Sequence, residues 1–177
     1  MSLAAILKPP RRASGGQSGQ PPAIIQSPSP NFNGRRQGTT LGVVMHSTNG
    51  GGATDKAEFS GTLGWFRNAV SMVSSHIVIA ANGTIAECVD PDNRAWHCGE
   101  LNDAYLGIEL AKPAASSHIT DEQLRSAAWW LKGMSARYGF PLNASTLPEH
   151  RQTSQGRSVG KVDIGGDYSF ERLRGFL

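Results

Sequence analysis

The sequence predicts a single α/β domain in which a mixed central β-sheet is flanked by helices. Three observations support this fold class: a short valine-rich strand at residues 41–45, an Asn82-Gly83 turn between two apolar segments, and a capped amphipathic helix after Thr120. The predicted order is strand, helix, hairpin, strand and helix, followed by a glycine-rich C-terminal segment. This order favours a sheet with helices packed on it.

The first predicted strand is the apolar run at residues 41–45. Three consecutive glycines follow it a few residues later. His46 stands at the C-terminal end of this strand. The helix that follows begins at Thr54 or Asp55. Its apolar face is predicted from spacings of three and four to contain Phe59, Leu63, Phe66 and Val70.

The Asn82-Gly83 pair predicts a β-hairpin, because both residues tolerate the positive φ angles that tight hairpin turns require. It joins a strand at residues 75–80 to an antiparallel strand at residues 85–89. Residues 105–110 are largely apolar and predict one more strand.

The second helix has the clearest boundaries. Thr120 and Gln123 have the spacing of a capping box, in which each side chain satisfies a backbone N–H of the other. Gly139 and Pro141 end the helix. Its apolar positions are Leu124, Ala127, Ala128, Leu131, Met134 and Tyr138.

Composition divides the chain into a leader at residues 1–21 and a folded domain at residues 22–177. The leader is rich in Pro, Gly, Ser, Gln and Arg, and such a segment cannot bury enough apolar surface to become ordered. We therefore expect it to be flexible. Residues 22–38 contain apolar anchors and several prolines, and we expect them to lie over the domain as irregular chain.

The net charge of +3 comes from the N-terminal part of the chain. Residues 1–38 hold five basic and no acidic residues, which leaves 12 basic and 14 acidic residues in the rest. A nearly neutral body argues against specific nucleic-acid binding, which needs a basic stripe on the folded part. We expect the leader to contact anionic polymers, and we expect no membrane span and no cleavable signal peptide.

The two cysteines, Cys88 and Cys98, form no metal-binding or redox motif, and we expect free thiols. The five histidines likewise lack the compact spacing of two ligands on one helix. From spacing alone, His46 could be a metal ligand or a hydrogen-bonded structural residue.

Four blocks of residues resemble the type 2 N-acetylmuramoyl-L-alanine amidases, a family related to peptidoglycan recognition proteins and to phage endolysins. The blocks occur in the family's order over some 120 residues. They are Val43-Val44-Met45-His46-Ser47-Thr48, Ser74-Ser75-His76-Ile77-Val78-Ile79 with its Asn82-Gly83 turn, Ala95-Trp96-His97-Cys98-Gly99 with Leu106-Gly107-Ile108-Glu109-Leu110, and Pro148-Glu149-His150-Arg151 with Lys161-Val162-Asp163.

The resemblance implies a zinc ion (Zn2+) held by His46, His150 and Asp163. Two imidazoles and one carboxylate leave a fourth tetrahedral position for water, as in catalytic zinc sites. The family usually has proline after this aspartate, whereas Ile164 follows it here. We therefore keep Asp167 as an alternative third ligand.

The resemblance also implies roles for other residues. We expect Glu109 to act as general base and acid, and Lys161 to stabilise the oxyanion, although a solvent-facing loop lysine is about equally open. Trp96 and His97 resemble a pair that lines the family's site, although a core tryptophan with a satisfied histidine is equally open. We expect His76 to be a hydrogen-bonded structural residue and His118 to be exposed.

These implications lead to one functional hypothesis and two alternatives. The first is a monomeric, endolysin-like amidase, made without a signal peptide, that acts on peptidoglycan at the bacterial cell wall. The second is a cytoplasmic amidase that recycles anhydro-muropeptides. The third is a peptidoglycan-binding module without catalysis, which the retained histidines and Glu109 argue against.

Overall fold

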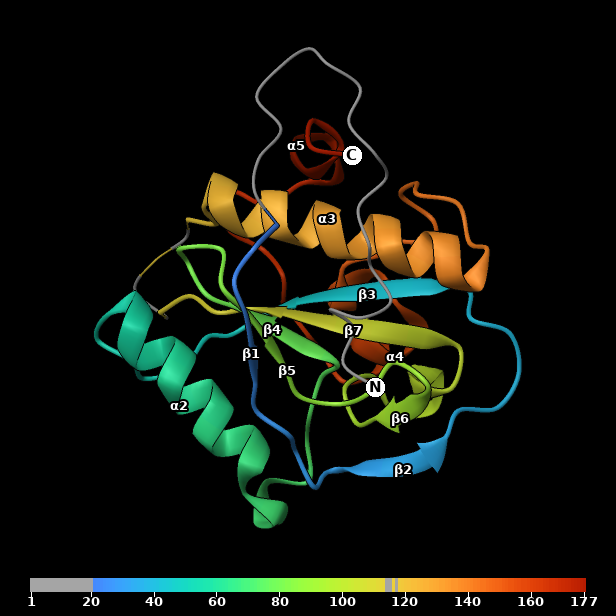
Figure 1. The fold of residues 1–177 in the computed structure, drawn as a ribbon, viewed down its shortest axis with the longest axis horizontal. Coiled ribbons are helices and arrows are strands. Elements are labelled where there is room, and N and C mark those ends of the chain that lie inside the picture. The colour runs from blue at the N-terminus through green and yellow to red at the C-terminus, as the bar shows by residue number, and fades with distance from the viewer. Residues whose placement is uncertain (1–20, 114–115, 117) are drawn as a thin grey trace.

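The computed structural model describes residues 21–113, 116 and 118–177 (Figure 1). Residues 1–20 of the predicted leader lie outside this range. In the described part of the chain, no helix has the length and apolar character needed to cross a membrane. The elements are β1 (Ile24–Gln26), β2 (Phe32–Arg35), β3 (Gly42–Ser47), α2 (Asp55–Arg67), η1 (Ala69–Ser71), β4 (Ile77–Ile79), β5 (Ile85–Glu87), β6 (Asn93–Ala95), η2 (Gly99–Asn102), β7 (Tyr105–Leu110), α3 (Asp121–Tyr138), η3 (His150–Gln152), α4 (Ser154–Ser158) and α5 (Phe170–Arg174).

The predicted mixed sheet is confirmed. Five strands lie in the order β1-β5-β4-β7-β3. The β4–β5 pair is antiparallel, and the pairs β1–β5, β4–β7 and β3–β7 are parallel. A separate antiparallel ribbon joins β2 to β6. The parallel pair β3–β7 matters most for the site, because it aligns His46 with Glu109.

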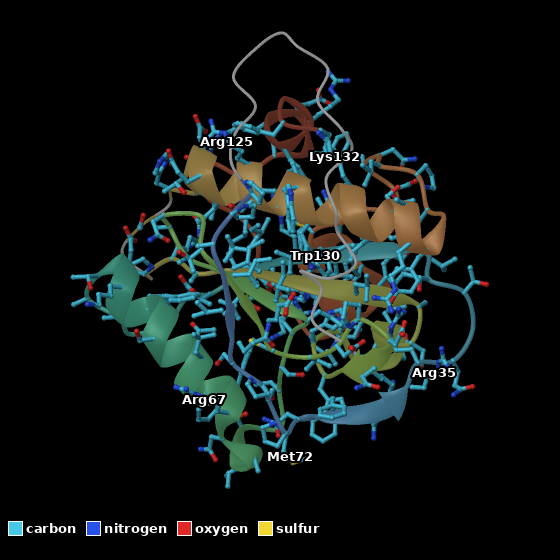
Figure 2. All side chains as sticks on the ribbon, viewed as in Figure 1. Arg35, Arg67, Met72, Arg125, Trp130 and Lys132 are labelled. Atoms are coloured by element: carbon cyan, nitrogen blue, oxygen red, sulfur yellow. The ribbon has the colours of Figure 1, made fainter. Side chains whose placement is uncertain are left out.

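Helices cover the two faces of the sheet unequally (Figure 1). On one face α3 buries the main core, which includes Trp130, Val43, Ile77 and Leu106. Trp130 is 1% exposed and lies between α3 and the sheet (Figure 2). On the other face α2 packs Leu63 and Phe66 against Val78 of β4 and Ala86 of β5. Beyond α2, the same face of β3 and β7 carries the polar side chains described below.

The elements with strong local signals form as predicted. Gly83 has φ +83° in the turn between β4 and β5, where a side chain would be strained. Thr120 and Gln123 form the capping box of α3, and Gly139 ends this helix with φ +78°. Both cysteines are free and buried, as expected.

Two predictions about the fold are wrong in detail. Val70 does not belong to the apolar face of α2, because the helix ends at Arg67 and Val70 is 84% exposed in η1. Residues 22–38 are not wholly irregular, since they form β1 along β5 and β2 along β6. The C-terminal segment contains η3, α4 and α5 in addition to loops.

Candidate metal centre and active site

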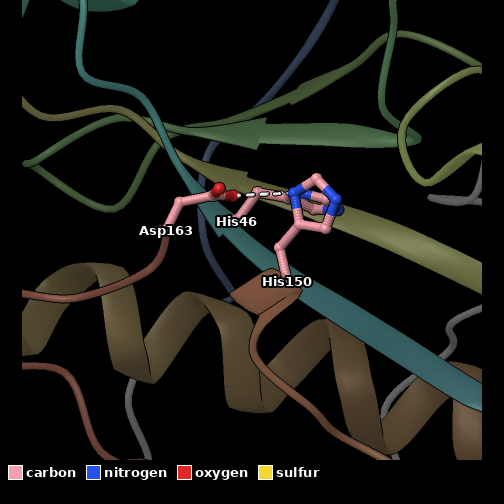
Figure 3. Close-up of side chains that lie close together, drawn as sticks. All are labelled: His46, His150 and Asp163. Carbon is pink, nitrogen blue, oxygen red and sulfur yellow. Dashed lines mark hydrogen bonds and ion pairs between the residues drawn. The ribbon is translucent and has the colours of Figure 1, made fainter. Parts of the chain in front are cut away.

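Three polar side chains from distant parts of the sequence meet at the C-terminal end of β3 (Figure 3). His46 Nδ1 lies 3.1 Å from His150 Nδ1 and 3.2 Å from Asp163 Oδ2. His150 Nδ1 lies 3.0 Å from the same carboxylate oxygen. One nitrogen of each imidazole and one carboxylate oxygen therefore form a compact triangle.

The chain brings His150 to His46 along the free edge of β3. The backbone N–H groups of Val43 and Met45 donate to the carbonyls of Thr146 and Pro148, at 2.8 and 2.9 Å. Gly42 permits this close approach, because a Cβ there would lie 1.9 Å from the Thr146 carbonyl oxygen. The segment then turns into η3, and His150 is its first residue.

Two further hydrogen bonds hold the Asp163 segment against the cluster. The Arg151 N–H donates to the Asp163 carbonyl at 2.8 Å, which ties the aspartate to the residue after His150. The Ser47 hydroxyl donates to the Ile164 carbonyl at 2.9 Å, which ties the same segment to the end of β3. Asp163 is thus fixed from both sides of the triangle.

The donor set fits a divalent metal ion. Ligands about 2.0–2.1 Å from a tetrahedral zinc lie about 3.3 Å apart, close to the separations in this triangle. The second nitrogen of each imidazole points away from the triangle: His46 Nε2 lies 3.0 Å from His97 Nδ1, and His150 Nε2 lies 2.7 Å from Gln155 Oε1. Both Nδ1 atoms are therefore available as ligands.

The charges of the cluster also favour a cation. Burial would raise the pKa of Asp163, but His150 and His46 beside its carboxylate hold this pKa below its ordinary value. Burial would lower the pKa of His150, yet hydrogen bonds to Asp163, Cys98 and Gln155 raise it to about 10. Burial lowers the pKa of His46. Without metal, a proton on His150 balances the carboxylate, and a bound cation would take its place.

The Glu109 side chain projects from the same face of the sheet as the His46 side chain, because the two residues are register partners on parallel strands. Burial and the nearby charge of Asp163 raise the pKa of Glu109 to about 8. A carboxyl with such a pKa changes its protonation state near neutral pH. Lys161 is exposed, and its charge acts on both Glu109 and His46.

The two residues of the Trp96-His97 pair have different surroundings. The Trp96 indole N–H donates to Asn33 Oδ1 at 2.7 Å, and its ring is half-buried. The His97 ring contacts His46, and its Nε2 lies 3.1 Å from the Tyr105 carbonyl oxygen. Both His97 nitrogens therefore have protein partners.

The remaining histidines lie as expected. His76 Nδ1 accepts from the Gly107 N–H at 2.9 Å, and its Nε2 lies 3.1 Å from the Asn93 carbonyl oxygen. His118 is exposed and lies 2.7 Å from Asp167 Oδ2. Asp167 is engaged there and does not join the triangle, so Asp163 is the carboxylate that the structure brings to the two histidines.

Comparison with known proteins identifies the family. Residues 36–163 match the family of N-acetylmuramoyl-L-alanine amidases. The chain belongs to this amidase family. The matched region contains His46, His150 and Asp163, and the expected resemblance is confirmed.

Curated relatives in the amidase family match about half of their own length. N-acetylmuramoyl-L-alanine amidase A of Achromobacter lyticus is 28% identical over 102 residues, which cover 56% of this chain and 54% of that protein. The 1,6-anhydro-N-acetylmuramyl-L-alanine amidase AmpD of Citrobacter freundii is 30% identical over 113 residues, covering 59% and 57%.

Solved structures of amidases and endolysins share the fold. A selenomethionine derivative of AmpD superposes with a TM-score of 0.64 at 24% identity, covering 89% of this chain and 94% of that one. The hydrolase AmiA of Staphylococcus aureus, in complex with its ligand, gives 0.64 at 19% identity, covering 89% and 82%. A mutant endolysin from Bacillus subtilis gives 0.62 at 19% identity, covering 88% and 99%.

Three residues around the centre were missed by sequence reasoning. Gln155 Oε1 contacts Nε2 of His150. Asn102 Oδ1 accepts hydrogen bonds from the backbone N–H groups of His97 and Cys98. Gly107 lies beneath the His97 ring, where a Cβ would come within 2.8 Å of the ring. Asn102 ends the short element η2 and Gln155 lies in the short helix α4, and neither element has a sequence pattern long enough to predict these contacts.

Proposed function

We propose that this protein is a zinc-dependent N-acetylmuramoyl-L-alanine amidase that hydrolyses the amide between N-acetylmuramic acid and L-alanine in peptidoglycan. The observation that carries the proposal is the triangle of His46, His150 and Asp163 with Glu109 on the same face of the sheet. Three protein ligands form an open, catalytic type of zinc site rather than a closed, structural one. Family membership supports the same chemistry.

In this proposal the chain's own residues hold the metal and move the proton. Zinc bound by the triangle would supply a nucleophilic water near neutral pH and would polarise the scissile carbonyl. Glu109 accepts the proton from the attacking water and delivers it to the leaving amine of L-alanine. Lys161 stabilises the negative charge that develops on the carbonyl oxygen. The raised pKa of Glu109 supports its ability to work in both directions.

The test measures zinc content and the release of new L-alanine amino termini from purified peptidoglycan, with and without a chelator. We expect one zinc per chain, and activity that is lost on chelation and restored by zinc. A protein that binds peptidoglycan without zinc and releases no amino termini would instead be a non-catalytic binding module.

We propose a lytic role at the bacterial cell wall, with the basic leader contacting anionic envelope polymers. Similarity to endolysins supports the fold such a role needs. Similarity to the AmpD enzymes favours a second candidate, recycling of soluble anhydro-muropeptides. Turnover of intact sacculi compared with soluble anhydro-muropeptides separates the two roles. A chain that lacks residues 1–21 should bind envelope fragments more weakly at low salt, and should differ less at high salt.

A further inference from the structure

We infer that His97 is a positioning residue for the proposed zinc site, which it serves by fixing the tautomer of the ligand His46. This inference rests on the proposed function and adds a residue through which the metal ligand is oriented. It differs from the expectation that the Trp96-His97 pair lines the site of the family.

The inference begins at the Tyr105 carbonyl, which can only accept hydrogen bonds. His97 Nε2 lies 3.1 Å from this oxygen and must therefore carry the hydrogen. In the neutral imidazole, Nδ1 is then the unprotonated nitrogen and accepts. Its partner at 3.0 Å is His46 Nε2, which must donate.

The consequence reaches the metal ligand itself. A neutral His46 with its hydrogen on Nε2 has a bare Nδ1, and this is the atom that faces His150 Nδ1 and Asp163 Oδ2. The opposite tautomer would place a hydrogen on Nδ1 and block it as a ligand. The two hydrogen bonds that connect Tyr105 to His97 and His97 to His46 therefore orient the lone pair of His46 Nδ1 toward the proposed metal position. Hydrogen-bond partners of ligating histidines commonly have this role.

The surroundings of His97 are built to hold its ring. The backbone N–H of His97 donates to Asn102 Oδ1 at 3.1 Å, which fixes the backbone at this residue. Its ring rests on Gly107, where a Cβ would meet Cγ, Nδ1 and Cδ2 at 2.8–3.0 Å. The ring is edge-on to His46, with centroids 5.2 Å apart. A residue whose backbone is fixed and whose ring is held by Gly107, His46 and the Tyr105 carbonyl suits a positioning role.

The experiment compares His97→Leu, His97→Asn and the exposed control His118→Asn in the full chain. Leucine removes the acceptor, whereas the asparagine Oδ1 stands near the place of imidazole Nδ1 and can accept from His46. Zinc affinity is measured by competition with a chromophoric chelator. We expect about a 10–100-fold loss in the leucine variant, retention of most affinity in the asparagine variant, and no change in the control.

Two-bond ¹H–¹⁵N spectra of the metal-free protein provide a second readout. We expect the His46 hydrogen on Nε2 in the native chain and in His97→Asn, and a shift toward Nδ1 in His97→Leu. A native chain with this hydrogen on Nδ1 overturns the inference, even if the leucine variant does not fold. A folded leucine variant with an unchanged His46 tautomer overturns it as well, whatever its zinc affinity.

The two readouts separate the failure of this inference from the failure of the proposed function. If the native chain binds no zinc, the proposed function fails, and the His46 tautomer still decides the role of His97. If zinc binds and turnover falls in His97→Leu while zinc affinity and tautomer are unchanged, His97 contacts substrate and the inference is wrong.

Discussion

Glu109 shows how one residue obtains its proposed role from its neighbours. Its register partner His46 lies on the adjacent parallel strand, and burial raises its pKa to about 8. An ordinary solvent-exposed glutamate would be fully ionised at neutral pH and a poor proton donor. In the proposed mechanism this carboxyl accepts a proton from the attacking water and donates it to the leaving amine.

Glu109→Gln should therefore lower turnover by about 10²–10⁴-fold, because glutamine cannot transfer the proton. Zinc content should stay at the native level, since Glu109 is not one of the three clustered ligands. The checks are steady-state release of amino termini and metal analysis of the same sample. Glu171→Gln, at an exposed residue of α5, should behave like the native protein. Full activity of Glu109→Gln would show that another group transfers the proton.

His76 makes a prediction about acid stability. Burial lowers its pKa to about 3, so the folded state holds it neutral while the unfolded chain protonates near pH 6.5. The unfolded state binds more protons in this window, and stability is lost as the pH falls through it. In metal-free protein, His76→Gln should reduce the slope of unfolding free energy against pH by up to about 1.4 kcal/mol per pH unit. Denaturant unfolding between pH 4 and 7 measures this slope, and an unchanged slope in His76→Gln would contradict the prediction.

At the scale of elements, β7 supports the candidate site through the contacts of Gly107 and the position of Glu109. Gly107 leaves room for the His97 ring, its N–H donates to His76, and its carbonyl accepts from the Ser75 hydroxyl at 2.9 Å. Two residues later, Glu109 lies on the same face of the sheet as His46. One strand thus holds the carboxyl proposed to transfer the proton and supports the histidine that contacts His46.

Gly107→Ala should weaken zinc binding, because the added Cβ would displace the His97 ring. Gly64→Ala is the matched control, since Gly64 lies on the exposed face of α2 with nothing within 4 Å of its added Cβ. The control should stabilise the protein by about 0.5–1 kcal/mol and leave zinc affinity unchanged. Thermal unfolding and chelator competition measure the two effects. Equal zinc affinity in both variants would refute the role given to Gly107.

At the scale of the whole molecule, α3 and α2 pack on opposite faces of the sheet, and His46 and Glu109 lie on the same face as α2. Local signals were enough to predict the hairpin at Asn82-Gly83 and the α3 helix after Thr120. The strands β1, β2 and β6 escaped prediction because they are three or four residues long and depend on distant partners. Val70 was misplaced because helical spacing continues beyond the residue at which α2 ends.

The candidate site could be predicted only through the family resemblance. His46 and His150 lie 104 positions apart, and spacing alone contains no information about their meeting. The structure brings them together with Asp163, while the roles of Glu109, Lys161 and Trp96 stay predictions. The contacts of His97 and Gln155 depend on tertiary packing, so only the folded chain could reveal them.

The most direct test of the central claim is the metal content of the purified protein and of three single variants. We predict one zinc per native chain, loss of zinc in His46→Ala and Asp163→Ala, and native zinc content in Asp167→Ala. Retention of zinc in Asp163→Ala together with its loss in Asp167→Ala would contradict the account, as would a native protein that binds no zinc.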